Sequence, residues 1–216
     1  MISLQCSVQF GIFEKAKNYF KKKEQTENIK LKSLLICSFL AGFGQSLVST
    51  PTEYIRIQMQ TSAKGQFKGN LDVVRQIIKH NGVLGVYRAW VATAIRESIG
   101  NCFYFTFYTK TLEGLQNPDK GSAYRTSVQL LAGALGGLGC WVSTFPVDVI
   151  KSRQQADSLT NPKYNSLRFC TKDTFEQLGV KGFTNGIAIC LVRACFVNAL
   201  TFAAFEWGKG LCEKLE

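Results

Sequence analysis

The sequence predicts an all-α membrane protein built from repeated pairs of helices. Three long stretches hold almost no charge: residues 33–52 have none, residues 126–147 have none, and residues 182–205 contain only Arg193. A helix of about 18 residues rises roughly 27 Å, which is close to the thickness of the hydrocarbon core of a bilayer. Several such stretches in a chain of 216 residues indicate membrane-spanning helices rather than the core of a soluble bundle.

The second observation is a motif that returns 95 residues further along the chain. In each copy a proline is followed, at the same offsets, by an acid, a base and a glutamine. A fixed spacing of this length is typical of a repeat architecture. The two copies are Pro51, Glu53, Arg56 and Gln60, and then Pro146, Asp148, Lys151 and Gln155.

A third motif places an acid and a base behind an aromatic residue, near residue 13 and again near residue 205. Together the motifs divide the chain into a remnant of a first repeat at 1–23, which holds only its second helix, a second repeat at 24–118 and a third at 119–216. Each full repeat is expected to contain two membrane helices with a short amphipathic helix between them. The expected long helices lie near 1–22, 31–60, 86–113, 124–155 and 184–212, and the short ones near 70–80 and 165–178.

The composition excludes several classes of function. The net charge is +11, but no nucleic-acid-binding motif accompanies it, and the lysines cluster between the apolar stretches, where they meet anionic head groups. We therefore expect a membrane partner and no nucleic acid. The eight cysteines and the single histidine have no metal-ligand spacing, and no phosphate loop or nucleophile motif occurs. We expect no metal, no cofactor and no enzyme activity.

The paired proline motifs, their matching glutamines and the small-residue run at 132–137 resemble the mitochondrial carrier family. The resemblance covers nearly the whole chain. It implies a helical barrel with pseudo-threefold repeats, a central cavity open to water, and alternating access to the two faces of the mitochondrial inner membrane. About five of the six transmembrane helices are expected within this chain.

The resemblance also implies two gates. Acids and bases behind the prolines are expected to pair between repeats and close the matrix side; the alternative is that they are interfacial charges facing head groups. On the cytoplasmic side repeat two has Thr109 and Leu112 in the charged places, so the network there is expected to be weak. The expected matrix gate is Glu53, Arg56, Gln60, Asp148, Lys151 and Gln155, and the cytoplasmic gate is Glu14, Lys17, Glu206 and Lys209.

A lipid site is implied at the start of the short helices and of the even-numbered membrane helices. Backbone N–H groups at a helix N-terminus bind phosphate, and cardiolipin is the anionic lipid that the resemblance implies. The matching positions, several of them imperfect copies of the family pattern, are Gly69, Tyr87, Arg88 and Gly186.

The candidate substrate site is a set of charges deep inside the apolar stretches, where charge is costly and marks function. Arg96, Glu97 and Arg193 fall at one depth of the repeat, and Gly100 is included with them. The alternative is a structural ion pair, but neighbours on a helix point about 100° apart, so we expect Arg96 and Glu97 not to neutralise each other. An arginine followed by an acid is similar to the amino-acid and carnitine branch, which implies a zwitterionic substrate: an amino acid, carnitine or acylcarnitine.

The sequence is compatible with two classes of function. One is a working transporter of a small-molecule substrate. The other is a truncated carrier remnant that does not transport, or an incomplete gene model, in which the absent first helix leaves the barrel unclosed.

Overall fold

The protein is helical throughout the part that the structure describes. The structure, a computed structural model, describes residues 2–24, 30–62, 67–115, 122–159, 162–194, 196–197 and 200, and no strand occurs among them. This confirms the all-α fold class. The helices are α1 (Ile2–Glu24), α2 (Leu31–Thr61), α3 (Asn70–Asn81), α4 (Trp90–Leu115), α5 (Ser122–Gln155) and α6 (Leu167–Leu178), with 3₁₀ turns η1 (Val83–Tyr87) and η2 (Val180–Phe183).

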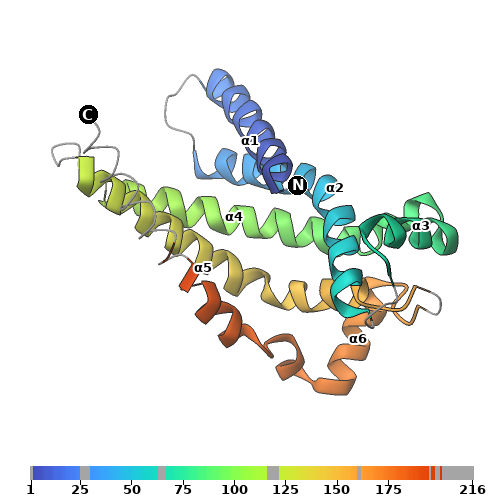
Figure 1. The fold of residues 1–216 in the computed structure, drawn as a ribbon. Helices are drawn as coiled ribbons and strands as arrows, with labels where there is room; N and C mark the ends of the chain where they lie inside the picture. Colours follow the sequence, from blue (N-terminus) through green and yellow to red (C-terminus); the bar gives the residue numbers. More distant parts are fainter. Residues whose placement is uncertain are drawn as a thin grey trace, which may run out of the picture.

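The two longest helices each contain the motif proline. Pro51 lies inside α2 and Pro146 inside α5, and the helices continue past them. Proline lacks the N–H that an α-helix needs and pushes against the preceding turn, so it bends a helix without ending it. Figure 1 shows α2 changing direction along its length. Of the helices described, α2 and residues 124–155 of α5 are long and apolar enough to cross a membrane.

Helix α4 begins later than the sequence predicts. The expected helix started at residue 86, but residues 83–87 form η1 and α4 starts at Trp90. The cause is Ala89, whose φ of 62° lies in the left-handed region and breaks the helical path. The equivalent residue of repeat three is Gly186, which has a φ of 92° and precedes the helical residues 187–194.

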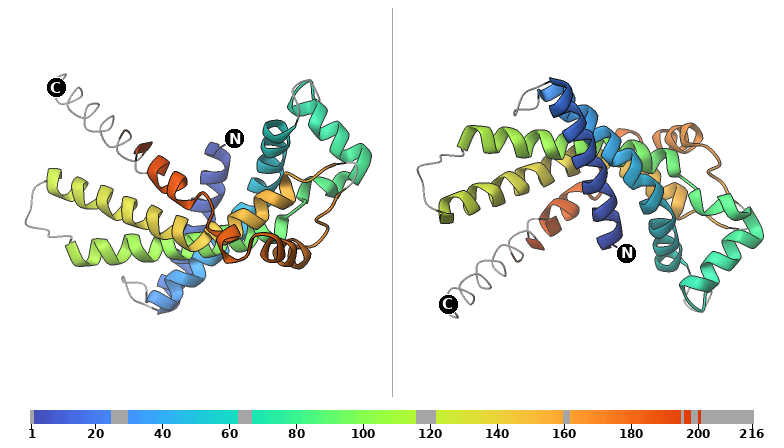
Figure 2. Two further views of the ribbon diagram at one scale, coloured as in Figure 1. Left: turned by 90° about the horizontal axis from the view of Figure 1, so that it is seen from below. Right: turned by 90° about the horizontal axis from the view of Figure 1, so that it is seen from above.

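Helix α4 packs along both α2 and α5, and α1 packs on α2 (Figure 2). The α2–α4 contact depends on Gly42, because a Cβ there would lie 2.5 Å from the carbonyl oxygen of Glu97. Gly136 similarly allows α5 to approach the backbone of Tyr104 in α4. Small residues permit such close approach between membrane helices. A Cβ at Gly137 would meet no atom within 4 Å, so not every small residue serves this packing.

Helix α1 also reaches α4 directly. The rings of Phe13 and Phe105 stack with centroids 4.1 Å apart, and one turn away the Gln9 amide donates to Asn101 Oδ1 at 2.8 Å. Phe13 and Phe105 belong to one apolar cluster with Cys37 and Ala41 of α2. Helix α1 is therefore tied to α4 by both an aromatic and an amide contact.

The ends of α2 and α5 are joined at the other end of the bundle. The Gln58 amide donates to the carbonyls of Gln155 at 2.8 Å and Asp157 at 2.9 Å. Arg88 forms an ion pair with Asp157 at 2.6 Å. Beneath these contacts Tyr54 and three other buried apolar residues form a second cluster. This end of the molecule fixes repeat two against repeat three.

The loop before α6 is held by a small polar network. The Lys163 ammonium contacts Asp173 at 2.9 Å, and the Tyr164 hydroxyl donates to the same carboxylate at 2.8 Å. The hydrogen bond from Lys163, and then that from Tyr164, place the pKa of the Asp173 carboxyl below its ordinary value.

Candidate functional site

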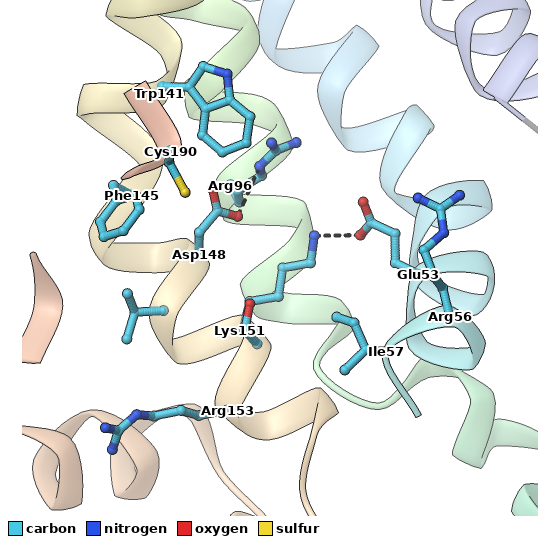
Figure 3. Close-up of a pocket in the computed structure, with 12 residues that line it drawn as sticks. Glu53, Arg56, Ile57, Arg96, Trp141, Phe145, Asp148, Lys151, Arg153 and Cys190 are labelled. Carbon is cyan, nitrogen blue, oxygen red and sulfur yellow. Dashed lines mark hydrogen bonds and ion pairs between the residues drawn. The ribbon is translucent and has the colours of Figure 1, made fainter. Parts of the chain in front are cut away.

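A cavity of about 500 Å³ opens beside α2, α4 and α5, next to the helical segment that follows η2 (Figure 3). Its wall combines charged side chains with two aromatic rings. Both copies of the proline motif contribute to it, so the charges behind the two prolines meet at one place. The lining residues are Glu53, Arg56, Ile57, Arg96, Trp141, Phe145, Asp148, Val149, Lys151, Ser152, Arg153 and Cys190.

Arg96 is the centre of the charged cluster. Its Nε donates to Asp148 Oδ1 at 3.1 Å and its Nη1 donates to Glu97 Oε1 at 2.7 Å. The guanidinium also lies 5.9 Å from the ring centroid of Trp141, within the range of a cation–π contact. Only 7% of the Glu97 side chain and 21% of the Arg96 side chain are exposed. A partly buried arginine thus lies between acids from two different helices.

The expectation that Arg96 and Glu97 would not neutralise each other is wrong. The two side chains leave α4 in different directions, but the arginine is long enough for its terminal nitrogen to return to its neighbour's carboxylate. Asp148, which the sequence assigned to the gate, contacts the same guanidinium. The sequence therefore separated two groups of residues that the fold brings together.

Lys151 of α5 forms an ion pair with Glu53 of α2. This contact joins repeat two to repeat three, and only 6% of the lysine side chain is exposed. Arg56 lines the same cavity, and Figure 3 shows it beside Glu53. The charges behind the prolines thus include an inter-repeat ion pair, and their role as a gate stays a prediction.

The glutamines of the motif differ in their surroundings. Gln155 is fully buried, and its side-chain amide has no hydrogen-bond partner in the described part of the chain, whereas Gln60 is exposed. Gln58, which was not among the expected site residues, instead makes the bonds to the end of α5. Alignment of the two repeats could have pointed to Gln58, because it occupies the position of the basic Arg153 in repeat three.

Other expected site residues lie at the edge of this cavity or away from it. Arg193 is exposed and is not among the lining residues. Gly100 faces α5, where a Cβ would lie 2.9 Å from the Cys140 sulfur, so its neighbours are protein atoms. Trp141 and Phe145, which supply the aromatic wall, were missed because a sequence gives no reason to separate them from core aromatics.

The expected gate at the opposite end is described only in part. Glu14 and Lys17 form an ion pair at 3.3 Å within one turn of α1. Glu206 and Lys209 lie outside the described residues, so a contact between the repeats there stays a prediction.

The expected lipid positions have mixed surroundings. Arg88 is directed at Asp157 and its side chain is only 13% exposed, while Tyr87 is 39% exposed. A Cβ at Gly69 would meet no atom within 4 Å, which leaves that backbone open. Cardiolipin binding at Gly69, Tyr87, Arg88 and Gly186 stays a prediction.

Two long apolar helices with internal prolines pack around buried charged side chains. This arrangement is typical of a helical membrane protein built from repeats. Residues 27–119 and 122–215 match the family model for mitochondrial carrier protein. The chain belongs to the mitochondrial carrier family.

Three relatives show the range of this similarity. The mitochondrial basic amino acids transporter of Rattus norvegicus is 37% identical over 76% of this chain and 54% of its own length. The mitochondrial glycine transporter of Saccharomyces cerevisiae is 30% identical over 93% of this chain and 67% of its own length, and the mitochondrial carnitine carrier of the same yeast is 26% identical over 95% and 63%. The chain thus spans little more than half of the rat protein. These relatives are transporters, which confirms the expectation of a non-enzyme and the resemblance to the amino-acid and carnitine branch.

Proposed function

We propose that the chain transports a small zwitterionic solute, an amino acid, carnitine or acylcarnitine, across the mitochondrial inner membrane by alternating access. The pair of Arg96 and Asp148 on the wall of the cavity, with Glu97 in contact with the same arginine, is the observation that supports this most. Ionised groups inside apolar helices are costly, and proteins retain them mainly along the path of a substrate.

The chemistry of the cluster suits a ligand with both signs of charge. The planar guanidinium of Arg96 binds a carboxylate through paired N–H donors. The carboxylates of Glu97 and Asp148 attract an ammonium or trimethylammonium group, and the face of Trp141 adds a second attraction for a cation. A cavity of about 500 Å³ lies in the usual size range for small-molecule sites. Arg193 and Gly100 are included in the proposed site on their positions in the sequence alone, because neither of them lines the cavity.

The names of the relatives agree with this substrate class. They refer to basic amino acids, to glycine and to carnitine. All of these solutes combine a carboxylate with a cationic nitrogen. We extend this shared chemistry, and not any one of the three solutes, to the present chain.

Two gates are proposed, one for each face of the membrane. Glu53, Arg56, Asp148 and Lys151, with Gln60 and Gln155, would close the matrix side; Glu14, Lys17, Glu206 and Lys209 would close the cytoplasmic side. The Glu14–Lys17 pair is exposed, and such pairs contribute only about 0–1 kcal/mol each, which suits contacts that break in every cycle. Cardiolipin would bind near Gly69, Tyr87, Arg88 and Gly186.

A thermal-shift panel tests the substrate class. The purified protein is heated with L-lysine, L-arginine, glycine, L-carnitine, acetylcarnitine or malate. The zwitterions are expected to raise the unfolding temperature and malate is not. Arg96→Ala should remove the shift, whereas Arg75→Ala, an exposed arginine on α3, should retain it. Stabilisation by malate alone, or an unchanged shift in Arg96→Ala, would refute the assignment.

A further inference from the structure

We infer that Asp148 competes with the substrate's carboxylate for Arg96, so that substrate binding releases Asp148 from α4. This inference rests on the proposed function and adds a specificity-determining residue to it. It starts from the fact that the arginine proposed to receive the carboxylate is already in contact with two carboxylates of the protein.

The two acids do not hold Arg96 equally. Glu97 is the next residue on the same helix, so its carboxylate stays near the guanidinium in any arrangement of the helices. Asp148 comes from α5 and contacts Arg96 through one oxygen, at 3.1 Å. Its second oxygen, Oδ2, is buried and has no hydrogen-bond partner among the described residues. Of the two acids, Asp148 makes the contact that is both incomplete and separable.

A substrate carboxylate can make a better contact with the same guanidinium. A free carboxylate can orient both oxygens toward two parallel N–H groups, and such bidentate pairs are stronger than a single bond. The Nε edge that Asp148 occupies is one of the edges that permit this geometry. Both groups cannot occupy that edge, so the two carboxylates exclude each other.

The test compares Asp148 with an acid outside the site. Asp148→Asn removes the competitor, and Glu113→Gln removes one negative charge from an exposed ion pair of α4 that does not line the cavity. Affinities are measured by titration of the protein in lipid nanodiscs with L-lysine and L-carnitine. Their counterparts without a carboxylate, cadaverine and choline, are titrated in parallel.

Asp148→Asn should bind lysine and carnitine about tenfold more tightly, which corresponds to about 1.4 kcal/mol, and should bind cadaverine and choline no more tightly. Glu113→Gln measures the general effect of losing one negative charge from the protein, and it should change the affinity for lysine and carnitine by no more than about twofold, or about 0.4 kcal/mol. Asp148→Glu retains a competing carboxylate and should show no gain, which provides a second test if the asparagine variant does not fold.

Equal or weaker lysine and carnitine binding by Asp148→Asn would overturn the inference and leave the proposed function standing, provided that the wild type binds them. An equal gain in Glu113→Gln, or a gain in Asp148→Glu, would also overturn it, because either would mean that Asp148 has no special relation to Arg96. Absence of binding by the wild type and all variants would refute the proposed function and the inference together.

Discussion

The glycine at the crossing of α2 and α4 offers a sharp test, because it lies against the backbone of a proposed substrate-binding residue. A Cβ at Gly42 would lie 2.5 Å from the carbonyl oxygen of Glu97 and 2.6 Å from Ser98 Cα. These are backbone atoms of a helix and cannot turn aside as a side chain would. Gly42→Ala must therefore push α4 away from α2 or strain both.

Overpacking of this kind costs about 1–3 kcal/mol, while replacing a helical glycine by alanine returns up to about 1 kcal/mol. The net expectation for Gly42→Ala is a loss of roughly 1–2 kcal/mol, which corresponds to a fall of several degrees in the unfolding temperature. The displacement also moves Glu97 and its neighbour, so lysine affinity should fall with the stability.

Gly137→Ala is the matched control. It lies in a helix, and a Cβ there would meet no atom within 4 Å. It should leave the unfolding temperature unchanged or slightly raised, by scanning fluorimetry in detergent, and should leave lysine affinity unchanged. If Gly42→Ala were as stable as the wild type and bound lysine equally well, the described crossing of α2 and α4 would be wrong.

Three further predictions concern other parts of the molecule. Glu53→Lys and Lys151→Glu should each impair transport in proteoliposomes, and the double exchange should restore part of it; a double variant no better than the singles would contradict the pairing. Ala89→Gly should stabilise the fold by about 1 kcal/mol, because glycine avoids the steric cost of a left-handed alanine, and it should therefore raise the unfolding temperature. An unchanged unfolding temperature would contradict the left-handed conformation. Because the folded-state pKa of Asp173 is lowered, its hydrogen bonds stabilise the fold above the ordinary aspartate pKa of about 4 and are lost as the pH falls through the lower folded value. The protection factors of the α6 amides, which correct for the slower intrinsic hydrogen exchange at low pH, should therefore fall in acid in the wild type but lack this acid dependence in Asp173→Asn.

Periodicity and repetition predicted most of the fold. The uncharged stretches predicted helices at 31–60 and 124–155, and the observed α2 and α5 differ from these bounds at one end only, by one and two residues. Stretches this long and apolar are hard to interpret as anything other than membrane helices. The late start of α4 could not be predicted, because alanine favours helix and nothing local announces that Ala89 takes a left-handed conformation. Only the glycine at the matching place of the next repeat hinted at it.

The candidate site was predicted less completely than the fold. The sequence selected Arg96, Glu97 and Asp148 but assigned them to two separate sites, because the offset from proline shows depth along one helix and not which helix lies opposite. The contact between Arg96 and Asp148 depends on the packing of α4 against α5. Trp141 becomes part of the site only through that same packing.

Uptake by proteoliposomes shows whether the protein carries zwitterionic solutes. Vesicles containing the purified protein are loaded with unlabelled lysine or carnitine, and entry of the labelled solute is compared with entry of labelled malate into malate-loaded vesicles. Uptake of the zwitterionic solutes should exceed uptake of malate and should be lost in Arg96→Ala. Preferred uptake of malate, or uptake by Arg96→Ala at the wild-type rate, would contradict the proposed function.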